Sequence, residues 1–414
     1  MNEPLAGAGK PLDGVRVVEL ARVLSGPYAT MLLADLGAEV IKVEHPGRGD
    51  DTRHWGPPDA GGESAYYLST NRGKRDLAID MKDPDGLAIV RDLCAGADVV
   101  IENFRPGVAA RLGVGYDDVS ARNPGVVYCS ISAFGDGREP ADRPGFDAVL
   151  QAETGFMHIT GEVDGVPSKV GVAITDVLTA LNSAVAINAA LFRRQASGKG
   201  EHVVVSLLDS ALSSLVNVVQ SALVSGEEAR RYGNAHASVV PYETLPVADG
   251  WITVAAGNDS LYRKLCAVLG RDDLADDPRF ATNTARVRNR EELMPELAKE
   301  LRTRPGQEWV DALNAAGVPV GKIRGVLEAV RAAAEAGRSA TFTVDHPTAG
   351  PLELVRPGFG DSAGGGMWTT TPPPRLGEHT REILTGLGLD ADRVAELEKR
   401  GVVRQALGAG PDVP

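Results

Sequence analysis

The chain is poor in cysteine, and its basic residues are outnumbered by its acids. Its three cysteines, Cys94, Cys129 and Cys266, lie far apart in 414 residues and without the spacing of metal ligands. This usage argues for a reducing compartment, with the cytoplasm as the default, and against a structural zinc site. The 43 Lys and Arg against 56 Asp and Glu give a formal net charge of −13. Because phosphate backbones select basic surfaces, nucleic acid is not an expected partner.

Membrane and dinucleotide signals are missing as well. No stretch approaches the ~20 apolar residues of a membrane span, and the first residues do not resemble a signal peptide, so we expect no membrane partner. The loop after the first expected strand has one Gly where a G-x-G-x-x-G fingerprint needs three, which disfavours a nicotinamide or flavin enzyme. The chain also lacks a P-loop and an H-E-x-x-H motif.

Apolar runs alternate with helical patterns through the first half of the chain. Strand–helix alternation predicts a parallel sheet wrapped by helices, the Rossmann-like doubly wound α/β class, with its ligand at the carboxyl ends of the strands. The expected strands cover 14–20, 38–44, 98–104 and 126–135, and the expected helices cover 26–37, 83–97 and a long run from 176. Residues 201–224 repeat a strand and a helix.

The pattern changes near residue 226, which predicts a second domain. We expect a large Rossmann-like domain over 1–225, a small α+β domain over 226–329, and a segment over 330–414 that returns to the large domain. Within this last segment, residues 356–380 are rich in Gly and Pro, which is typical of an extended crossing segment. A final amphipathic helix is expected over roughly 379–400.

Basic residues gather at two places near predicted strand ends. Arg72, Lys74 and Arg75 lie in "NRGKR", and Arg105 and Arg111 follow the strand over 98–104. Isolated surface charges are usually solvated, but the carboxyl ends of strands are where ligands bind. Solvated loop charge and a phosphate pocket therefore both remain open.

Asp176 interrupts the apolar run "KVGVAITDVLTAL". Asp is among the best helix N-caps, and Asp209 opens another apolar helix in the same way. Gly171 and Ala173 remove side-chain bulk from the strand expected before Asp176, so that a ligand could come close. A helix cap and a nucleophile both remain open on these residues alone.

Several long blocks together resemble the family III CoA transferases, the group of formyl-CoA transferase and carnitine CoA-transferase. The resemblance covers nearly the whole chain and implies that Asp176 is the nucleophile of a transfer through a mixed anhydride and an aspartyl-CoA thioester. Its substrates would be an acyl-CoA and a small carboxylic acid, with no prosthetic group and no metal. The blocks are "LDGVRVVELARVLSGPYATMLLADLGAEVIKVEHPGRGDDTR", "NRGKRDLAIDMK", "ADVVIENFRPG", "GVAITD", "SGKGEHVVVSLLDSAL" and "RLGEHTREIL".

The same resemblance implies a CoA pocket. Lys82, Arg105 and Arg111 would face phosphates, while His45 stands where formyl-CoA transferase has Arg, so a weaker or pH-sensitive contact to the nucleotide is expected there. The implied pocket comprises Val23, Leu24, Ser25, His45, Ile79, Lys82, Asn103, Phe104, Arg105, Arg111, Phe146 and Asp147.

The resemblance also bears on substrate and assembly. The region "GNAHASVVPYETL" (233–245) lacks the run of glycines that covers the site in formyl-CoA transferase, which argues against formyl or oxalyl transfer. The chain is closer to the succinyl-CoA-dependent members that use dicarboxylic or branched acids. Family members are interlocked dimers, so a homodimer is expected.

Two alternatives share this fold. The alpha-methylacyl-CoA racemases also have an Asp at the position of Asp176, but their G-H-D triplet is "GFD" here, with Phe146 in place of the His. Asn258 stands where the racemase Glu falls. A non-catalytic CoA-binding relative is disfavoured by the intact Asp176 and Lys82.

Overall fold

The computed structural model describes residues 9–135, 143–360 and 368–406. Its contacts divide the chain into two compact units. The sheet unit takes the residues up to 156, residues 170–220 and the residues from 339 onward, and the small unit takes residues 157–169 and 221–338.

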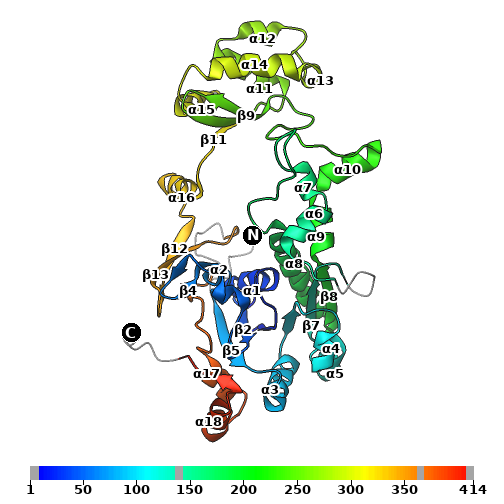
Figure 1. Cartoon of the computed structure of the whole chain (residues 1–414), viewed down its shortest axis with the longest axis vertical. Helices are drawn as coiled ribbons and strands as arrows, with labels where there is room; N and C mark the ends of the chain where they lie inside the picture. The colour runs from blue at the N-terminus through cyan, green and yellow to red at the C-terminus, as the bar shows by residue number, and fades with distance from the viewer. Residues whose placement is uncertain (1–8, 136–142, 361–367, 407–414) are drawn as a thin grey trace, which may run out of the picture. The chain divides into compact units, whose positions relative to one another are not determined.

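A seven-stranded sheet forms the centre of the sheet unit in the described part of the chain (Figure 1). Its order is β14–β5–β2–β1–β6–β7–β8, and every neighbouring pair is parallel except β14 with β5. The predicted Rossmann-like doubly wound class is therefore confirmed. The strands are β1 (Arg16–Glu19), β2 (Glu39–Glu44), β5 (Lys74–Ile79), β6 (Val99–Glu102), β7 (Val127–Ser132), β8 (Glu201–Ser206) and β14 (Val403–Arg404).

The strand order reverses between β1 and β6. From β1 the chain adds β2 and then β5 on one side, whereas β6, β7 and β8 extend the sheet on the other side. The loops after β1 and β6 meet at the carboxyl edge of the sheet, which makes this the switch point where doubly wound folds bind ligands. Ser25 and Asn103, both implied CoA contacts, follow these two strands.

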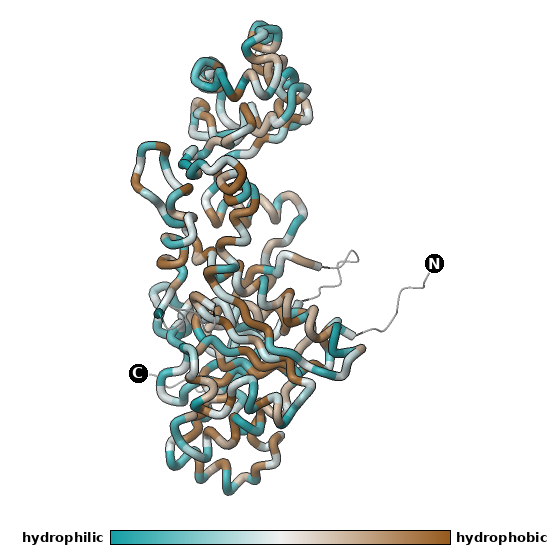
Figure 2. The backbone as a smooth tube through the Cα atoms, turned by 90° about the vertical axis from the view of Figure 1, so that its right-hand side faces the viewer, coloured by the Kyte–Doolittle hydropathy of each residue, from teal (hydrophilic) through white to brown (hydrophobic). Residues whose placement is uncertain are grey.

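Helices cover both faces of the sheet. Side chains alternate along a strand, so Val17 packs into one core layer and its neighbour Val18 into the other. Figure 2 shows the strands of the sheet as hydrophobic. The layer of Val17 includes side chains from α1 (Ser25–Asp35) and α8 (Ile174–Ser197), and that of Val18 includes side chains from α3 (Pro84–Ala95), α5 (Tyr116–Arg122), α17 (Thr380–Gly386) and α18 (Ala391–Lys399).

Helix α8 is a helix of this core. It packs against α1, α9 (Leu207–Ser214) and β7. By length and composition it is apolar enough to cross a membrane, contrary to the sequence-based expectation, and 44% of its most apolar window is buried inside the structure. A helix that is buried on two sides by its own protein has this same composition, so the signal is weak evidence for a membrane span.

Several elements differ from the prediction. Lys74 and Arg75 begin strand β5 instead of lying in a loop. The expected helix over 379–400 is two helices, α17 and α18, because Gly388 takes a φ of +91° and Asp390 caps a new helix. The helix expected after β8 is interrupted at Val216, which begins α10 (Val216–Ser225). Residues 361–367 of the predicted crossing segment lie outside the described residues.

The small unit is built around an antiparallel sheet of order β11–β10–β9. Its core contains the buried side chains of Tyr262 and Trp309. The sheet comprises β9 (Tyr242–Val247), β10 (Gly250–Ala255) and β11 (Val320–Lys322), and the helices of this core are α11 (Asp259–Leu269), α12 (Asp272–Asp276), α14 (Arg290–Leu301) and α15 (Gly306–Ala315).

Candidate active site

Asp176 is the third residue of helix α8 and does not cap it. The helix begins at Ile174, and the residue at the N-cap position is Ala173, whose side chain makes no capping hydrogen bond. Residues 170–173 form an irregular approach instead of the expected strand. The interpretation of Asp176 as the cap is therefore wrong, and its carboxylate is not required for that task.

The cap comes from Asp147, the first residue of α6 (Asp147–Glu153). Its Oδ1 accepts hydrogen bonds from the backbone N–H and the hydroxyl of Thr175, both at 2.8 Å. Its Oδ2 accepts a hydrogen bond from Nε2 of Gln151 at 2.7 Å, and Oε1 of Gln151 accepts one from the Val170 N–H at 2.8 Å. The resemblance assigns Asp147 to the CoA pocket, but both of its oxygens are engaged by the protein.

The Asp176 carboxyl is partly buried and lies within the electrostatic influence of the Asp147 carboxylate. Burial raises the pKa of Asp176 to about 7, the negative charge of Asp147 acts in the same direction, and a hydrogen bond with Ser25 acts against them. At neutral pH a substantial fraction of Asp176 is therefore ionised, and its carboxylate is more basic than that of an ordinary Asp. This combination suits a carboxylate nucleophile.

Ser25 follows a strained loop at the switch point. Val23 has a φ of +74°, a conformation in which a β-branched residue is an outlier. Its backbone N–H donates to the two carboxylate oxygens of Asp50, at 3.3 and 3.2 Å. Nζ of Lys42 lies 2.9 Å from Asp50 and donates to the carbonyl of Ala21 at 3.2 Å. These contacts stabilise the loop that places Ser25 against Asp176.

Asn103 holds the same loop from the other side of the switch point. Its Oδ1 accepts a hydrogen bond from the Arg22 N–H at 3.0 Å, and its Nδ2 donates to the Arg22 carbonyl at 2.8 Å. The resemblance assigns Asn103 to CoA as well. Its side-chain amide is engaged with the loop after β1, which gives it a positioning role, and its contact with CoA stays a prediction.

A buried ion-pair network underlies this loop. Glu19 lies 2.8 Å from both Lys42 and Lys74, and the three side chains have no exposed surface. Burial acts to lower the pKa of Lys42, but the charges of Asp50 and Glu19 outweigh burial and hold it above its usual value. Burial lowers the pKa of Lys74 to about 8.

The basic cluster of "NRGKR" is therefore structural and forms no phosphate pocket. Arg72 donates two hydrogen bonds to the buried carboxylate of Asp35, at 3.0 and 2.6 Å. Lys74 is committed to Glu19, and Arg75 pairs with Glu39. Of the two alternatives, solvated loop charge and a phosphate pocket, neither holds for this cluster, because its charges pair with residues that are distant in the sequence.

The other basic positions of the implied pocket are exposed. Lys82 lies after β5, Arg105 after β6, and Arg111 in α4 (Val108–Leu112). His45 follows β2, and its Nδ1 accepts a hydrogen bond from the Gly47 N–H at 3.0 Å. Because these residues follow the carboxyl ends of neighbouring strands, they share one edge of the sheet with the loop after β1.

Two members of the implied pocket, Leu24 and Ile79, have side chains that are buried inside the protein. Leu24 is 8% exposed and Ile79 is 1% exposed. Ile79 packs in the hydrophobic core on the α3 side of the sheet. The implied pocket thus includes exposed side chains such as Lys82 and buried side chains such as Ile79, which packs in the hydrophobic core.

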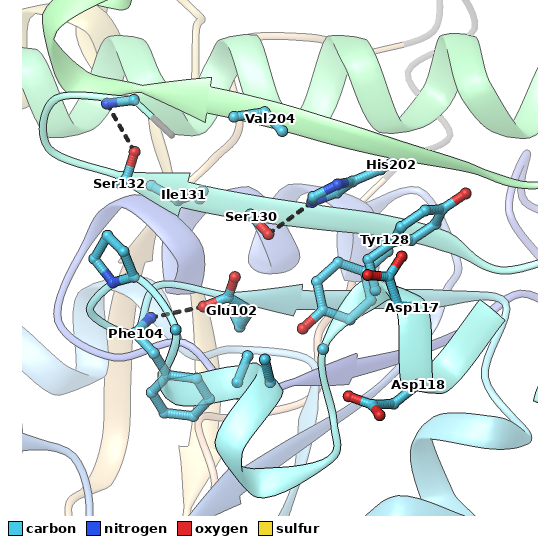
Figure 3. A pocket seen from close by; sticks show the side chains of 17 residues that line it. Glu102, Phe104, Asp117, Asp118, Tyr128, Ser130, Ile131, Ser132, His202 and Val204 are labelled. Atoms are coloured by element: carbon cyan, nitrogen blue, oxygen red, sulfur yellow. Dashed lines mark hydrogen bonds between the residues drawn. The ribbon is translucent and has the colours of Figure 1, made fainter. Parts of the chain in front are cut away.

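Phe104 lines a cavity of about 420 Å³ (Figure 3). Oε2 of the buried Glu102 accepts a hydrogen bond from the Phe104 N–H at 2.8 Å, and burial raises the pKa of Glu102. Oγ of Ser130 lies 2.9 Å from Nε2 of His202, and the His202 ring stacks on Tyr116 with 4.7 Å between centroids. Sequence reasoning missed this group because its members lie on β6, β7, β8 and α5 with no local motif.

The positions that a racemase would use carry other roles. Phe146 precedes α6, and its side chain is 65% exposed and has no titratable proton. In the small unit, Oδ1 of Asn258 accepts a hydrogen bond from the Leu261 N–H at 2.9 Å and caps α11. Within the described ranges, no three or more His, Cys, Asp or Glu side chains are grouped so as to hold a metal ion.

Comparisons with known proteins identify the family of this chain. The model of CoA-transferase family III matches residues 12–380. Succinyl-CoA:glutarate CoA-transferase of Mus musculus is 41% identical over 397 residues, which cover 96% of this chain and 91% of that protein. Succinate–glutarate CoA-transferase of Agrobacterium fabrum is 43% identical over 383 residues, covering 91% and 96%. A solved CAIB/BAIF family protein from Brucella suis is 40% identical, with a TM-score of 0.82 over 92% of this chain and 100% of its own. The chain therefore belongs to the family III CoA-transferases, as its sequence blocks indicate.

Proposed function

We propose that this protein transfers CoA from succinyl-CoA to a small dicarboxylic acid, with Asp176 as the nucleophile. CoA transfer follows from the family, and the names of the relatives support the donor and the class of acceptor. The observation that carries the proposal is the position of Asp176 in the first turn of α8, next to Thr175, which Asp147 binds, and in a setting where burial raises its pKa to about 7.

The reaction proceeds by two exchanges at Asp176. An oxygen of its carboxylate attacks the thioester carbonyl carbon, the carbon–sulfur bond breaks, and CoA leaves as a thiolate from a mixed anhydride. The thiolate then attacks the Asp176 carbonyl carbon, the donor acid leaves as a carboxylate, and an aspartyl-CoA thioester remains. The acceptor carboxylate repeats both steps in reverse, so that one difficult exchange becomes several easier steps.

Neighbouring groups support these steps. The positive N-terminal end of the α8 dipole favours negative charge and stabilises the charge that develops on the thioester oxygen. Lys82, Arg105 and Arg111 supply cations for the phosphates of CoA at the same sheet edge. The chemistry needs no prosthetic group and no metal, because the nucleophile and the leaving thiolate supply all the electrons.

The proposed setting is the cytoplasm, and the proposed assembly is a homodimer. Buried, unpaired Cys94, Cys129 and Cys266 support a reducing compartment. The homodimer rests on the family resemblance.

Trapping of the covalent intermediate tests the proposal. Incubation with succinyl-CoA followed by hydroxylamine should leave a hydroxamate on Asp176, located by mass spectrometry of the peptides. A panel of acyl-CoA donors crossed with free acids, read out as thioesters formed, identifies the acceptor.

Asp176→Ala should lose nearly all transfer while it still binds CoA. Asp209→Asn is the matched control, because Asp209 lies in the first turn of α9 and hydrogen-bonds Ser206. Wild-type transfer rates in Asp176→Ala would refute the mechanism.

A further inference from the structure

The first turn of α8 is held by a carboxylate from a different helix. Asp147 is 9% exposed, and three hydrogen bonds from Thr175 and Gln151 use both of its oxygens. Gln151 in turn bonds the N–H of Val170 and the carbonyl of Val172, so the approach to α8 is tied to α6 at several points. Both carboxylate oxygens of Asp147 are thus engaged within the protein.

We infer that Asp147 is a positioning residue for CoA transfer. It fixes the start of α8 through Thr175, and its negative charge favours the acylated, neutral form of Asp176 over the free carboxylate. This inference rests on the proposed function, because it requires that Asp176 is acylated during turnover.

The charge part of the inference follows from the groups around Asp176. Asp147 reaches it from α6, Ser25 from α1, and Tyr66 from α2 (Ala65–Thr70). Burial, then the charges of Asp176 and Asp147, raise the pKa of Tyr66 to about 12, so Tyr66 is neutral at pH 7. Among the described neighbours, Asp147 is therefore the group whose negative charge acts on Asp176.

Acylation of Asp176 removes the electrostatic repulsion between its carboxylate and that of Asp147. The free enzyme carries two carboxylates close together, whereas the anhydride and the aspartyl-CoA thioester leave Asp176 without charge. The repulsion therefore raises the free energy of the free carboxylate relative to both covalent states. It is restored only when the acceptor has taken CoA and the carboxylate is released.

Two substitutions separate the cap from the charge. Asp147→Asn keeps an oxygen for the Thr175 N–H and hydroxyl but removes the negative charge and the acceptor of the Gln151 Nε2–H. Asp147→Ala removes the oxygen for Thr175 as well. Asp209→Asn is the control, because it removes a charge from the first turn of α9 without touching Thr175 or Gln151.

The first readouts are the pH dependence of kcat/KM and the steady-state fraction of enzyme held as aspartyl-CoA. For Asp147→Asn we expect the acidic limb to move down by about one pH unit, because a like charge raises a carboxyl pKa. We also expect a severalfold smaller covalent fraction with succinyl-CoA at saturation. Asp209→Asn should change neither value. An unchanged limb and covalent fraction together with a raised KM for the donor would overturn the inference, because they would make Asp147 a CoA contact.

Amide hydrogen exchange tests the cap without any substrate. Asp147→Ala should lose most of the exchange protection of the Thr175 N–H, whereas Asp147→Asn should keep it. Equal protection in wild type and Asp147→Ala would overturn the cap. A wild-type enzyme that forms no adduct at Asp176 would instead refute the proposed function and, with it, the charge effect, while the exchange result would still decide the cap.

Discussion

Asn103 makes hydrogen bonds to both backbone polar groups of Arg22 across the switch point of the sheet. The two residues follow β6 and β1, the strands between which the order reverses. Together with the Asp50 contact to the N–H of Val23, this pairing holds the loop in a conformation that the positive φ of Val23 disfavours. The position of Ser25 against Asp176 therefore depends on side chains that do not themselves contact Asp176.

Asn103→Ala should lower kcat more than it raises the KM of the donor. The loop loses two hydrogen bonds, and a displaced Ser25 no longer orients Asp176, which we expect to cost about tenfold or more in kcat. Steady-state kinetics with amide exchange at Arg22 and Val23 checks this. If kcat stays unchanged while the donor KM rises and exchange is unaltered, Asn103 contacts CoA directly.

Asp176→Asn should stabilise the fold at pH 8 and leave its stability unchanged near pH 4. The folded carboxyl keeps its proton up to about pH 7, whereas the unfolded one loses it near pH 4, so wild-type stability falls between these values. Above pH 7 the neutral amide avoids the cost of a buried charge, a gain of roughly 1–3 kcal/mol. Urea unfolding of wild type and Asp176→Asn at pH 4 and pH 8 measures this difference in stability. Equal stabilities at pH 8 would contradict the raised pKa.

Lys82→Ala should weaken donor binding, whereas Lys74→Ala should destabilise the fold. Lys82 is exposed at the sheet edge, so its loss should raise the donor KM, leave the acceptor KM largely alone and leave stability within about 0.5 kcal/mol. Lys74 is buried against Glu19, so its loss should cost roughly 3–5 kcal/mol of stability. Kinetics for both substrates and denaturant titration separate the two effects. An equal rise of both KM values in Lys82→Ala would count against the phosphate contact.

A 2-methylacyl-CoA incubated in D₂O should gain no deuterium at its α-carbon above background. Racemisation needs two positioned acid–base groups, and Phe146 supplies none at the position of the racemase His. Asn258 is occupied as the cap of α11. Mass spectrometry of the recovered thioester, with Asp176→Ala as the matched control, measures the exchange. Enzyme-dependent incorporation that disappears in the control would show α-proton chemistry.

The sequence predicts β1, β2, β6 and β7 and misses β5. The runs that became β1, β2, β6 and β7 are buried on both faces and carry branched residues, which marks them as parallel strands. Strand β5 places Lys74 and Asp76 in the interior, where Lys74 pairs with Glu19 of β1 and Asp76 lies 3.8 Å from Arg53 of the 3-10 helix Asp51–His54. A charge in the sequence indicates solvent unless its partner is known, and here the partners are distant.

The caps of helices α8 and α9 also show that a partner distant in the sequence cannot be predicted from a local pattern. Asp176 and Asp209 both lie at the third position of their helices, and the caps are Asp147 and Ser206. Ser206 precedes its helix directly and was within reach of local reasoning. Asp147 lies 28 residues before Thr175 and belongs to a separate helix, so no local pattern could identify it. The resemblance implies that Asp176 is the nucleophile, whereas the cap of its helix can be seen only in the fold.

The pairing of β14 with β5 has a consequence for the order in which the chain can fold during synthesis. Val403 pairs with Ile79, so the outer edge of β5 stays open until residues near 403 have left the ribosome. The small unit, whose residues end at 338, is complete before that point. A nascent chain therefore carries a finished small unit and an unfinished sheet with an exposed edge, the feature that favours pairing with other chains. The final strand closes that edge.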